Sequence, residues 1–264
     1  MEFQVGSIQW KATRFGSGPQ WLIALHGYGQ EASVFRHFAE LHHDIYSLLV
    51  IDLAYHGTQS SMQKGFIFDE AYASAWMQAM LDQLAISKIG LLGYSIGGRI
   101  SMSIAAWFPE FIEELILIAP DGMPVSSTYR CLTGTRAGQM LFRKFISSPG
   151  IAFLLIRLGE KLKLLPLKVA DYFRNEISTE EKRQQLFDTW MAYRKCLPQA
   201  RLLREQRALP VMCILGKSDK VIPFRKARRF ALKQFASVQL LELNMGHNLL
   251  SEKAMKQISA YWKQ

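Results

Sequence analysis

A serine enclosed by glycines is the first candidate for chemistry in this chain. Ser95 lies in "GYSIG", between an apolar run and a segment with helical spacing. Glycines at this spacing are typical of a strand that turns sharply into a helix with the serine at the apex, because Gly93 and Gly97 let the two backbones pass closely. A serine hydroxyl is a weak nucleophile near neutral pH, so it needs a general base that an acid holds in the correct tautomer.

A histidine and an aspartate near the carboxyl end of the chain fit these two roles. His247 lies in "LNMGHNLL", after the last apolar run, and Asp219 lies in "ILGKSDKVIP", after the preceding one. Asp121 in "IAPDG" is an alternative acid, and an aspartate close to glycine is also common in ordinary turns. We expect Ser95, His247 and one of these carboxylates to meet at the carboxyl edge of a parallel sheet.

The glycine-bearing segment "LHGYGQ", residues 25–30, is the candidate for stabilising negative charge. A tetrahedral intermediate of acyl transfer needs two donors aimed at its oxyanion. We expect the backbone N–H groups of Ile96, which follows the serine, and of Tyr28 to provide them. A plain turn at the end of a strand is the alternative for this segment. His26 in the same segment is a candidate for contact with the substrate.

Apolar runs and helical segments alternate through most of the chain. Runs that are nearly continuous rather than alternating indicate strands buried on both faces. They cover residues 21–27, 46–53, 88–95, 114–120, 210–216 and 237–244, and helical spacing occurs in 69–85, 99–108, 224–235 and 251–264. This alternation predicts an α/β fold with a mostly parallel sheet and helices on both faces.

Residues 122–207 interrupt that alternation. They contain no convincing strand pattern, but several amphipathic helical stretches punctuated by prolines. We therefore expect a core made of residues 1–121 and 208–264, with 122–207 inserted as a helical cap that is a lid by position. Apolar stretches at 137–146 and 151–167 either line an acyl pocket or form the packed faces of helices, which is the commoner case.

The net charge of +10 is concentrated in the expected cap. Residues 122–207 hold 16 Lys and Arg against 7 Asp and Glu, which leaves +1 for the rest of the chain. Such a basic segment can face an anionic substrate, a phospholipid surface or nucleic acid, or it can be a solvated helical surface. The sequence shows no recognisable nucleic-acid-binding module, and we expect no nucleic-acid partner.

Cysteine usage and hydropathy address the compartment. The three cysteines have no paired spacing, which favours a reducing, cytoplasmic setting. No apolar run approaches the roughly 20 residues of a membrane-spanning helix. The first residues lack the charge pattern of a secretory signal, so we expect neither a transmembrane segment nor a signal peptide. Nothing in the sequence indicates the oligomeric state.

Taken in order, the motifs "HGYG", "DLAYHGTQS", "GYSIGG", "GKSDKVIP" and "GH" resemble the α/β-hydrolase superfamily, in its serine-nucleophile branch with a helical cap. The resemblance implies an eight-stranded sheet, with "FQVGSI" and "WKATRF" as its first strand pair, and a triad of Ser95, His247 and Asp219. At "DLAYHG" the sequence departs from the usual pattern, and we interpret Asp52 and His56 as organisers of the loop.

The resemblance leaves three functions open. The first is hydrolysis of an ester or thioester of a small or medium acyl group, without metal or cofactor. The second follows from "GYSIGGR", which resembles the corresponding motif of menaquinone-pathway lyases that eliminate pyruvate from an anionic cyclohexene adduct; Arg99 would then bind the anionic substrate, or else it lies on the helix surface. Carbon–carbon bond hydrolysis belongs with this second group. The third is a non-catalytic ligand-binding protein, which the filled triad positions disfavour.

Overall fold

The protein is described by a computed structural model that covers residues 1–162, 167–206 and 208–262. The chain divides into two compact units. The first comprises Met1–Met62, Phe68–Pro124 and Lys195–Gln264, and the second comprises Gln63–Ile67 and Val125–Arg194. Parts of two expected segments, 163–166 and 207 in the cap and 263–264 in the last helix, lie outside the described residues.

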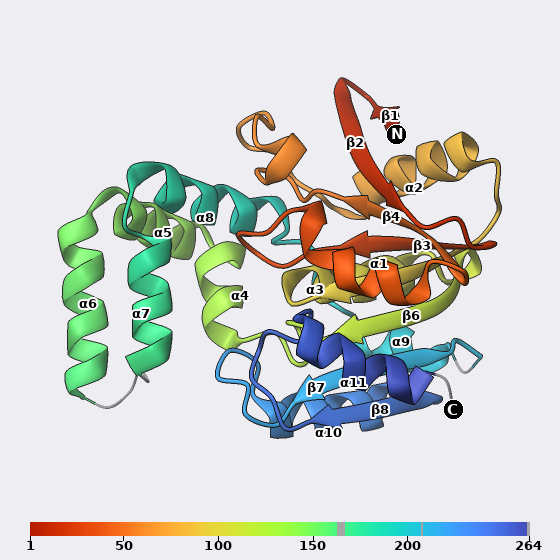
Figure 1. Ribbon diagram of the computed structural model, residues 1–264. Helices are drawn as coiled ribbons and strands as arrows, with labels where there is room; N and C mark the ends of the chain where they lie inside the picture. The colour runs from red at the N-terminus through yellow and green to blue at the C-terminus, as the bar shows by residue number, and fades with distance from the viewer. Residues whose placement is uncertain (163–166, 207, 263–264) are drawn as a thin grey trace. The chain divides into compact units, whose positions relative to one another are not determined.

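The first unit contains an eight-stranded, mostly parallel sheet, as predicted (Figure 1). The spatial order is β1-β2-β4-β3-β5-β6-β7-β8, and only the β1–β2 and β2–β4 pairs are antiparallel. Each predicted apolar run forms a strand, and the expected first pair is present. The strands are β1 (Glu2–Val5), β2 (Ile8–Phe15), β3 (Gln20–Leu25), β4 (Tyr46–Ile51), β5 (Ile89–Tyr94), β6 (Ile112–Ile118), β7 (Val211–Gly216) and β8 (Val238–Leu243).

Helices cover both faces of this sheet (Figure 1). Two of them contact each other on one face, α1 (Arg36–His42) and α11 (Glu252–Trp262). The other face carries α2 (Glu70–Leu84), α3 (Ile96–Trp107), α9 (Ala200–Glu205) and α10 (Phe224–Gln234). Three short 3₁₀ helices complete the unit: η1 (Ala32–Phe35), η2 (Gly57–Gln59) and η3 (Pro109–Phe111).

Burial explains why the central strands have nearly continuous apolar sequences. All six residues of β4 and all six of β5 are buried, because helices lie over both faces of the parallel sheet. The carboxyl ends of parallel strands meet at one edge of the sheet, and the loops that follow β3, β5, β6, β7 and β8 leave from that edge. These loops carry the candidate residues His26, Ser95, Asp121, Asp219 and His247.

The second unit is helical. It contains α4 (Ser127–Gly134), α5 (Arg136–Ser147), α6 (Pro149–Lys161), α7 (Leu167–Glu176) and α8 (Glu180–Ala192). Phe142 of α5 packs against Phe187 and Trp190 of α8, with ring centroids 5.2 and 5.1 Å apart. Side-chain caps from Ser126, Thr135 and Thr179 begin three of the helices. That this unit acts as a lid stays a prediction.

The expected insertion and the compact helical unit differ at their carboxyl boundary. Helix α9 falls within 122–207 but belongs to the first unit, where it packs against α3 and α10. Arg204 of α9 donates to Gln234 of α10 at 2.9 Å, and Gln206 donates to the Ala105 carbonyl of α3 at 2.6 Å.

In the described part of the chain, no helix combines the length and the apolar character needed to cross a bilayer.

Candidate active site

Ser95 occupies a strained turn between β5 and α3. Its backbone has φ 52° and ψ −118°, in the positive-φ region that side chains rarely adopt. The neighbouring glycines are required by close backbone contacts. A Cβ on Gly97 would lie 1.9 Å from the Leu25 carbonyl oxygen, and a Cβ on Gly93 would lie 2.5 Å from Gly98 Cα. The turn therefore holds Ser95 at the carboxyl edge of the sheet, as the sequence predicted.

The structure brings Ser95, His247 and Asp219 into one hydrogen-bonded chain. His247 Nε2 lies 3.2 Å from Ser95 Oγ, and His247 Nδ1 lies 2.8 Å from Asp219 Oδ2. The other carboxylate oxygen of Asp219 accepts backbone N–H bonds from Val221 at 2.7 Å and Ile222 at 2.9 Å. Because the ionised carboxylate can only accept, Nδ1 of a neutral His247 carries the proton and Nε2 presents its lone pair to the serine hydroxyl.

The alternative acid has a different partner. Asp121 Oδ2 lies 3.4 Å from Arg99 Nη1, and Oδ1 accepts from the Gly122 N–H at 2.7 Å. The Asp121 carboxylate thus compensates a buried guanidinium, while Asp219 holds His247.

Arg99 itself corrects one expectation. Its side chain is 1% exposed, so the interpretation that it lies on the helix surface is wrong. The reason is that α3 is buried along its whole length from Ile96 to Ala106. A Cβ on Gly122 would lie 2.9 Å from Arg99 Cγ, which shows how closely the loop after β6 covers the arginine stem.

Tyr94 is a site residue that sequence reasoning missed. Its hydroxyl donates to the His247 carbonyl oxygen at 3.1 Å, and its ring lies 5.4 Å from the imidazole between centroids. On the other side, a Cβ on Gly27 would come within 3.1 Å of the Tyr94 ring. Tyr94 therefore lies between the histidine loop and the loop of Tyr28. Its position next to Ser95 was the only signal in the sequence, because the hydrogen bond spans 153 residues.

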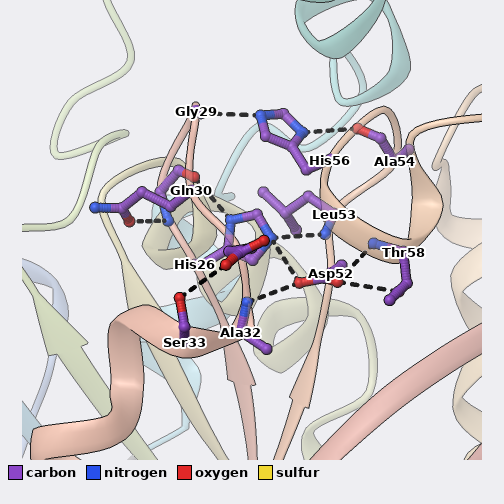
Figure 2. Close-up of polar contacts among 12 residues, drawn as sticks. His26, Gly29, Gln30, Ala32, Ser33, Asp52, Leu53, Ala54, His56 and Thr58 are labelled. Carbon is purple, nitrogen blue, oxygen red and sulfur yellow. Dashed lines mark hydrogen bonds and ion pairs between the residues drawn. The ribbon is translucent and has the colours of Figure 1, made fainter.

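The loop that carries Tyr28 is fixed on both sides of that residue. The Gly27 N–H donates to Gln30 Oε1 at 3.0 Å, and the Gly29 N–H donates to His56 Nε2 at 2.9 Å (Figure 2). Ile96 is the first residue of α3, and the N–H groups at a helix start have no intrahelical acceptor and carry partial positive charge. Both expected donors thus belong to segments whose backbone is held in place.

His26 is placed differently from the expectation that it contacts substrate. It is completely buried. Nδ1 donates to the Gly27 carbonyl oxygen at 2.8 Å, and Nε2 accepts from the Leu53 N–H at 3.0 Å. With both nitrogens bonded inside the protein, the ring connects the loop after β3 to the loop after β4, and we correct the substrate-binding assignment accordingly.

Asp52 makes the contacts of a loop organiser. Its carboxylate accepts from the Ala32 N–H at 2.9 Å, the Thr58 N–H at 2.8 Å and the Thr58 hydroxyl at 3.0 Å (Figure 2). A Cβ on Gly57 would lie 2.3 Å from Asp52 Oδ2, so only glycine fits beside the carboxylate. Burial raises the pKa of Asp52, but the adjacent His26 ring and the Thr58 donors outweigh burial and lower the pKa to about 2.

His56 connects that loop to the Tyr28 loop. Its Nδ1 donates to the Ala54 carbonyl oxygen at 3.0 Å, while Nε2 accepts from Gly29. Burial, followed by the nearby His26 ring, lowers the pKa of His56 from 6.5 to about 4. The imidazole is therefore neutral at pH 7 and keeps the lone pair that the Gly29 amide requires.

Sequence comparisons agree with this geometry. A family model of the alpha/beta hydrolase fold matches residues 20–254. An uncharacterized hydrolase, YugF of Bacillus subtilis, is 24% identical over 246 residues, which cover 92% of this chain and 89% of the relative. A pimeloyl-[acyl-carrier protein] methyl ester esterase of Aeromonas salmonicida is 32% identical over 106 residues, 40% of this chain and 39% of the relative. The chain spans 31–36% of the length of several further curated relatives.

Solved structures show the same fold. A thermophilic esterase from Thermogutta terrifontis superimposes with a TM-score of 0.69 at 19% identity, covering 100% of this chain and 97% of that one. An enol-lactonase from Burkholderia xenovorans gives a TM-score of 0.66 at 16% identity, with 99% and 100% coverage. At these identities the likeness concerns the fold, and the family match supplies the relationship. The chain therefore belongs to the α/β-hydrolase fold family.

Proposed function

We propose that this α/β-fold hydrolase is a serine hydrolase that cleaves an ester or thioester of a small or medium acyl group through an acyl-enzyme on Ser95. One observation carries the proposal: the chain of hydrogen bonds from Asp219 through His247 to Ser95, with the serine on a strained turn. The strain itself costs about 1–3 kcal/mol, and such costs concentrate at functional sites.

The first half of the proposed reaction forms the acyl-enzyme. His247 Nε2 accepts the hydroxyl proton while Ser95 Oγ attacks the carbonyl carbon, so that positive charge appears on the imidazole beside the Asp219 carboxylate. His247 then returns the proton to the leaving oxygen or sulfur, and the tetrahedral intermediate collapses to the acyl-enzyme. In the second half, water loses its proton to His247 and attacks the acyl carbon. His247 then gives that proton to Ser95 Oγ as the bond to the acyl carbon breaks, which releases the acid and restores Ser95.

The Ile96 and Tyr28 N–H groups would stabilise the oxyanion in both halves. Each donor of this kind contributes about 3–4 kcal/mol to the transition state when it is fixed before the reaction. The Gly27–Gln30 and Gly29–His56 bonds support this role, since they leave the Tyr28 loop little freedom.

The alternatives have less support. A lyase that binds an anionic adduct through Arg99 would need its guanidinium at the site, but Arg99 is buried and faces Asp121. A non-catalytic binding protein has no need for a proton relay or for a strained serine. One relative that is similar in sequence is named a methyl ester esterase, which favours ester substrates here.

The proposal is tested by hydrolysis of p-nitrophenyl esters of increasing chain length beside acyl-CoA thioesters. We expect turnover with an optimum at short or medium chains, lost in Ser95→Ala by at least 10³-fold. Ser147→Ala, an exposed serine on α5, is the matched control and should keep full activity. Turnover by Ser95→Ala at the wild-type rate, or no turnover of any ester or thioester by the wild type, would overturn the proposal.

A further inference from the structure

Helix α6 exposes a stripe of large apolar side chains. Ile151, Leu154 and Leu158 are 44%, 55% and 43% exposed, and Leu162, just after the helix, is 64% exposed. Spacings of three and four residues place these side chains on one face of the helix. Contiguous apolar surface of this kind is uncommon on soluble monomers and marks a binding surface.

Helix α5, which contacts α6, also exposes two large apolar side chains. Met140 is 73% exposed and Leu141 is 62% exposed. We call the exposed surface of these two helices the α5–α6 face. Its apolar side chains are Met140, Leu141, Ile151, Leu154, Leu158 and Leu162. Its cations are Arg143, Lys144, Arg157 and Lys161.

The internal packing of the two helices uses other side chains. Phe142 and Ile146 of α5 and Ala152 and Ile156 of α6 are buried. The sequence left open whether the apolar stretches of this region line an acyl pocket or form packed helix faces. The structure shows that both helices have a packed apolar face and, in addition, an exposed one.

The exposed charged side chains on α5 and α6 are all cations. Arg157 and Lys161 are exposed on α6. A rotation of about 100° per residue about the helix axis places them beside the stripe. Lys144 is exposed on α5, and so is Arg143, whose guanidinium lies over the Phe187 ring of α8. Residues 122–159 contain five Lys and Arg and no Asp or Glu. The first carboxylate after them, Glu160, forms an ion pair with Arg174.

We propose that the α5–α6 face docks onto an anionic phospholipid surface. Apolar side chains flanked by long cationic ones fit the boundary between lipid headgroups and acyl chains, where the leucines insert and the Lys and Arg termini reach the phosphates. Both parts of the surface match: the apolar stripe matches the acyl boundary, and the absence of carboxylates from residues 122–159 matches negative headgroups. This inference stands independently of the proposed ester hydrolysis.

A second basic surface, on α10, is the alternative site for binding an anionic lipid surface. The charge outside residues 122–207 is strongly polarised: residues 1–121 hold 6 Lys and Arg against 12 Asp and Glu, and residues 208–264 hold 10 against 3. The expectation that the basic character belongs to one segment is therefore wrong. On α10, Arg225, Arg229 and Lys233 line a shallow groove with the 51% exposed Leu232. This surface carries charge without an apolar stripe, so it fits a lipid boundary less well.

The test is co-sedimentation of the full chain with vesicles of phosphatidylcholine alone or mixed with phosphatidylglycerol. We expect binding to the mixed vesicles, weakened by salt. Arg157→Gln with Lys161→Gln should weaken binding about 25-fold, at roughly fivefold per cation. Leu154→Glu with Leu158→Glu should weaken it at least as much, because it removes apolar contact and adds repulsion. Circular dichroism checks that each variant is folded.

Two matched controls locate the surface. Leu41→Glu changes a leucine that is 40% exposed on α1, and Arg225→Gln with Arg229→Gln removes two cations from α10. Both should bind like the wild type. Equal binding to both vesicle types, loss of binding in the α10 variant alone, or a dimer that Leu154→Glu with Leu158→Glu converts to a monomer would overturn the proposal. Ser95→Ala should bind vesicles normally, which separates this inference from the fate of the proposed activity.

Discussion

Replacing Asp219 by asparagine should nearly abolish turnover while leaving the fold intact. The carboxylate accepts three hydrogen bonds, two from the Val221 and Ile222 amides through Oδ1 and one from His247 through Oδ2. In Asp219→Asn the amide oxygen can keep the two backbone bonds, but its NH₂ group then faces His247 Nδ1. Two donors cannot pair, so the imidazole changes tautomer and presents N–H, in place of a lone pair, to Ser95.

The two consequences differ in size. The lost proton acceptor should lower kcat about 10⁴-fold, as the equivalent change does in serine proteases, which corresponds to about 5 kcal/mol of activation free energy. Stability should fall by only about 1–2 kcal/mol, because a single hydrogen bond to the carboxylate is exchanged. Ester hydrolysis gives kcat, and urea unfolding gives the free energy of unfolding.

Asp121→Asn is the matched comparison. Asp121 faces Arg99, so its loss should lower stability but change kcat less than tenfold. If Asp219→Asn retained wild-type kcat while Asp121→Asn lost it, the assignment of the acid would be refuted.

Three further predictions concern the loops and turns around the site. The pKa of His56 is about 4 in the folded protein and 6.5 as its ordinary value, so the unfolded chain binds more protons than the folded one between pH 4 and 6.5. The free energy of unfolding should therefore fall by roughly 3 kcal/mol as the pH falls from 6.5 to 4. Urea unfolding across this range should show that decline, and His56→Gln should flatten it; an unchanged slope would contradict the assignment. Gly97→Ala should lower Tm by many degrees or prevent folding, since its Cβ would lie 1.9 Å from a strand carbonyl oxygen, whereas Gly134→Ala, which has open space, should leave Tm nearly unchanged; equal Tm values would refute the packing argument. Tyr94→Phe removes one hydrogen bond to the His247 loop and should reduce kcat less than tenfold with KM unchanged, and a loss as large as that of Asp219→Asn would mean that Tyr94 takes part in the chemistry.

The strands of the sheet could be predicted because burial on both faces leaves a direct mark on the sequence. Each of the six runs forms a strand, and five of them form interior strands of the sheet, while the more polar run at 237–244 forms the edge strand β8. Helix α1 was not predicted, because its seven residues, "RHFAELH", are too few to establish a helical period. Helix α3 begins at Ile96, three residues earlier than expected, since the turn at Ser95 passes directly into the helix.

The site could be predicted where short motifs follow strands, and less well where it depends on pairing between loops. The contacts of Ser95, His247 and Asp219 follow from their places after parallel strands. The Arg99–Asp121 ion pair depends on the close approach of α3 and the loop after β6, which residue types do not reveal. The charge of Arg99 suggested exposure, and the glycine-rich loop around His26 suggested contact with substrate. Both side chains are instead buried.

Covalent labelling tests whether Ser95 is the nucleophile. The protein is treated with a fluorophosphonate probe, digested and analysed by tandem mass spectrometry. We expect one adduct on the peptide that contains Ser95, fully lost in Ser95→Ala and formed much more slowly in Asp219→Asn. Labelling that persists in Ser95→Ala, or an adduct on another residue of the wild type, would contradict this role of Ser95.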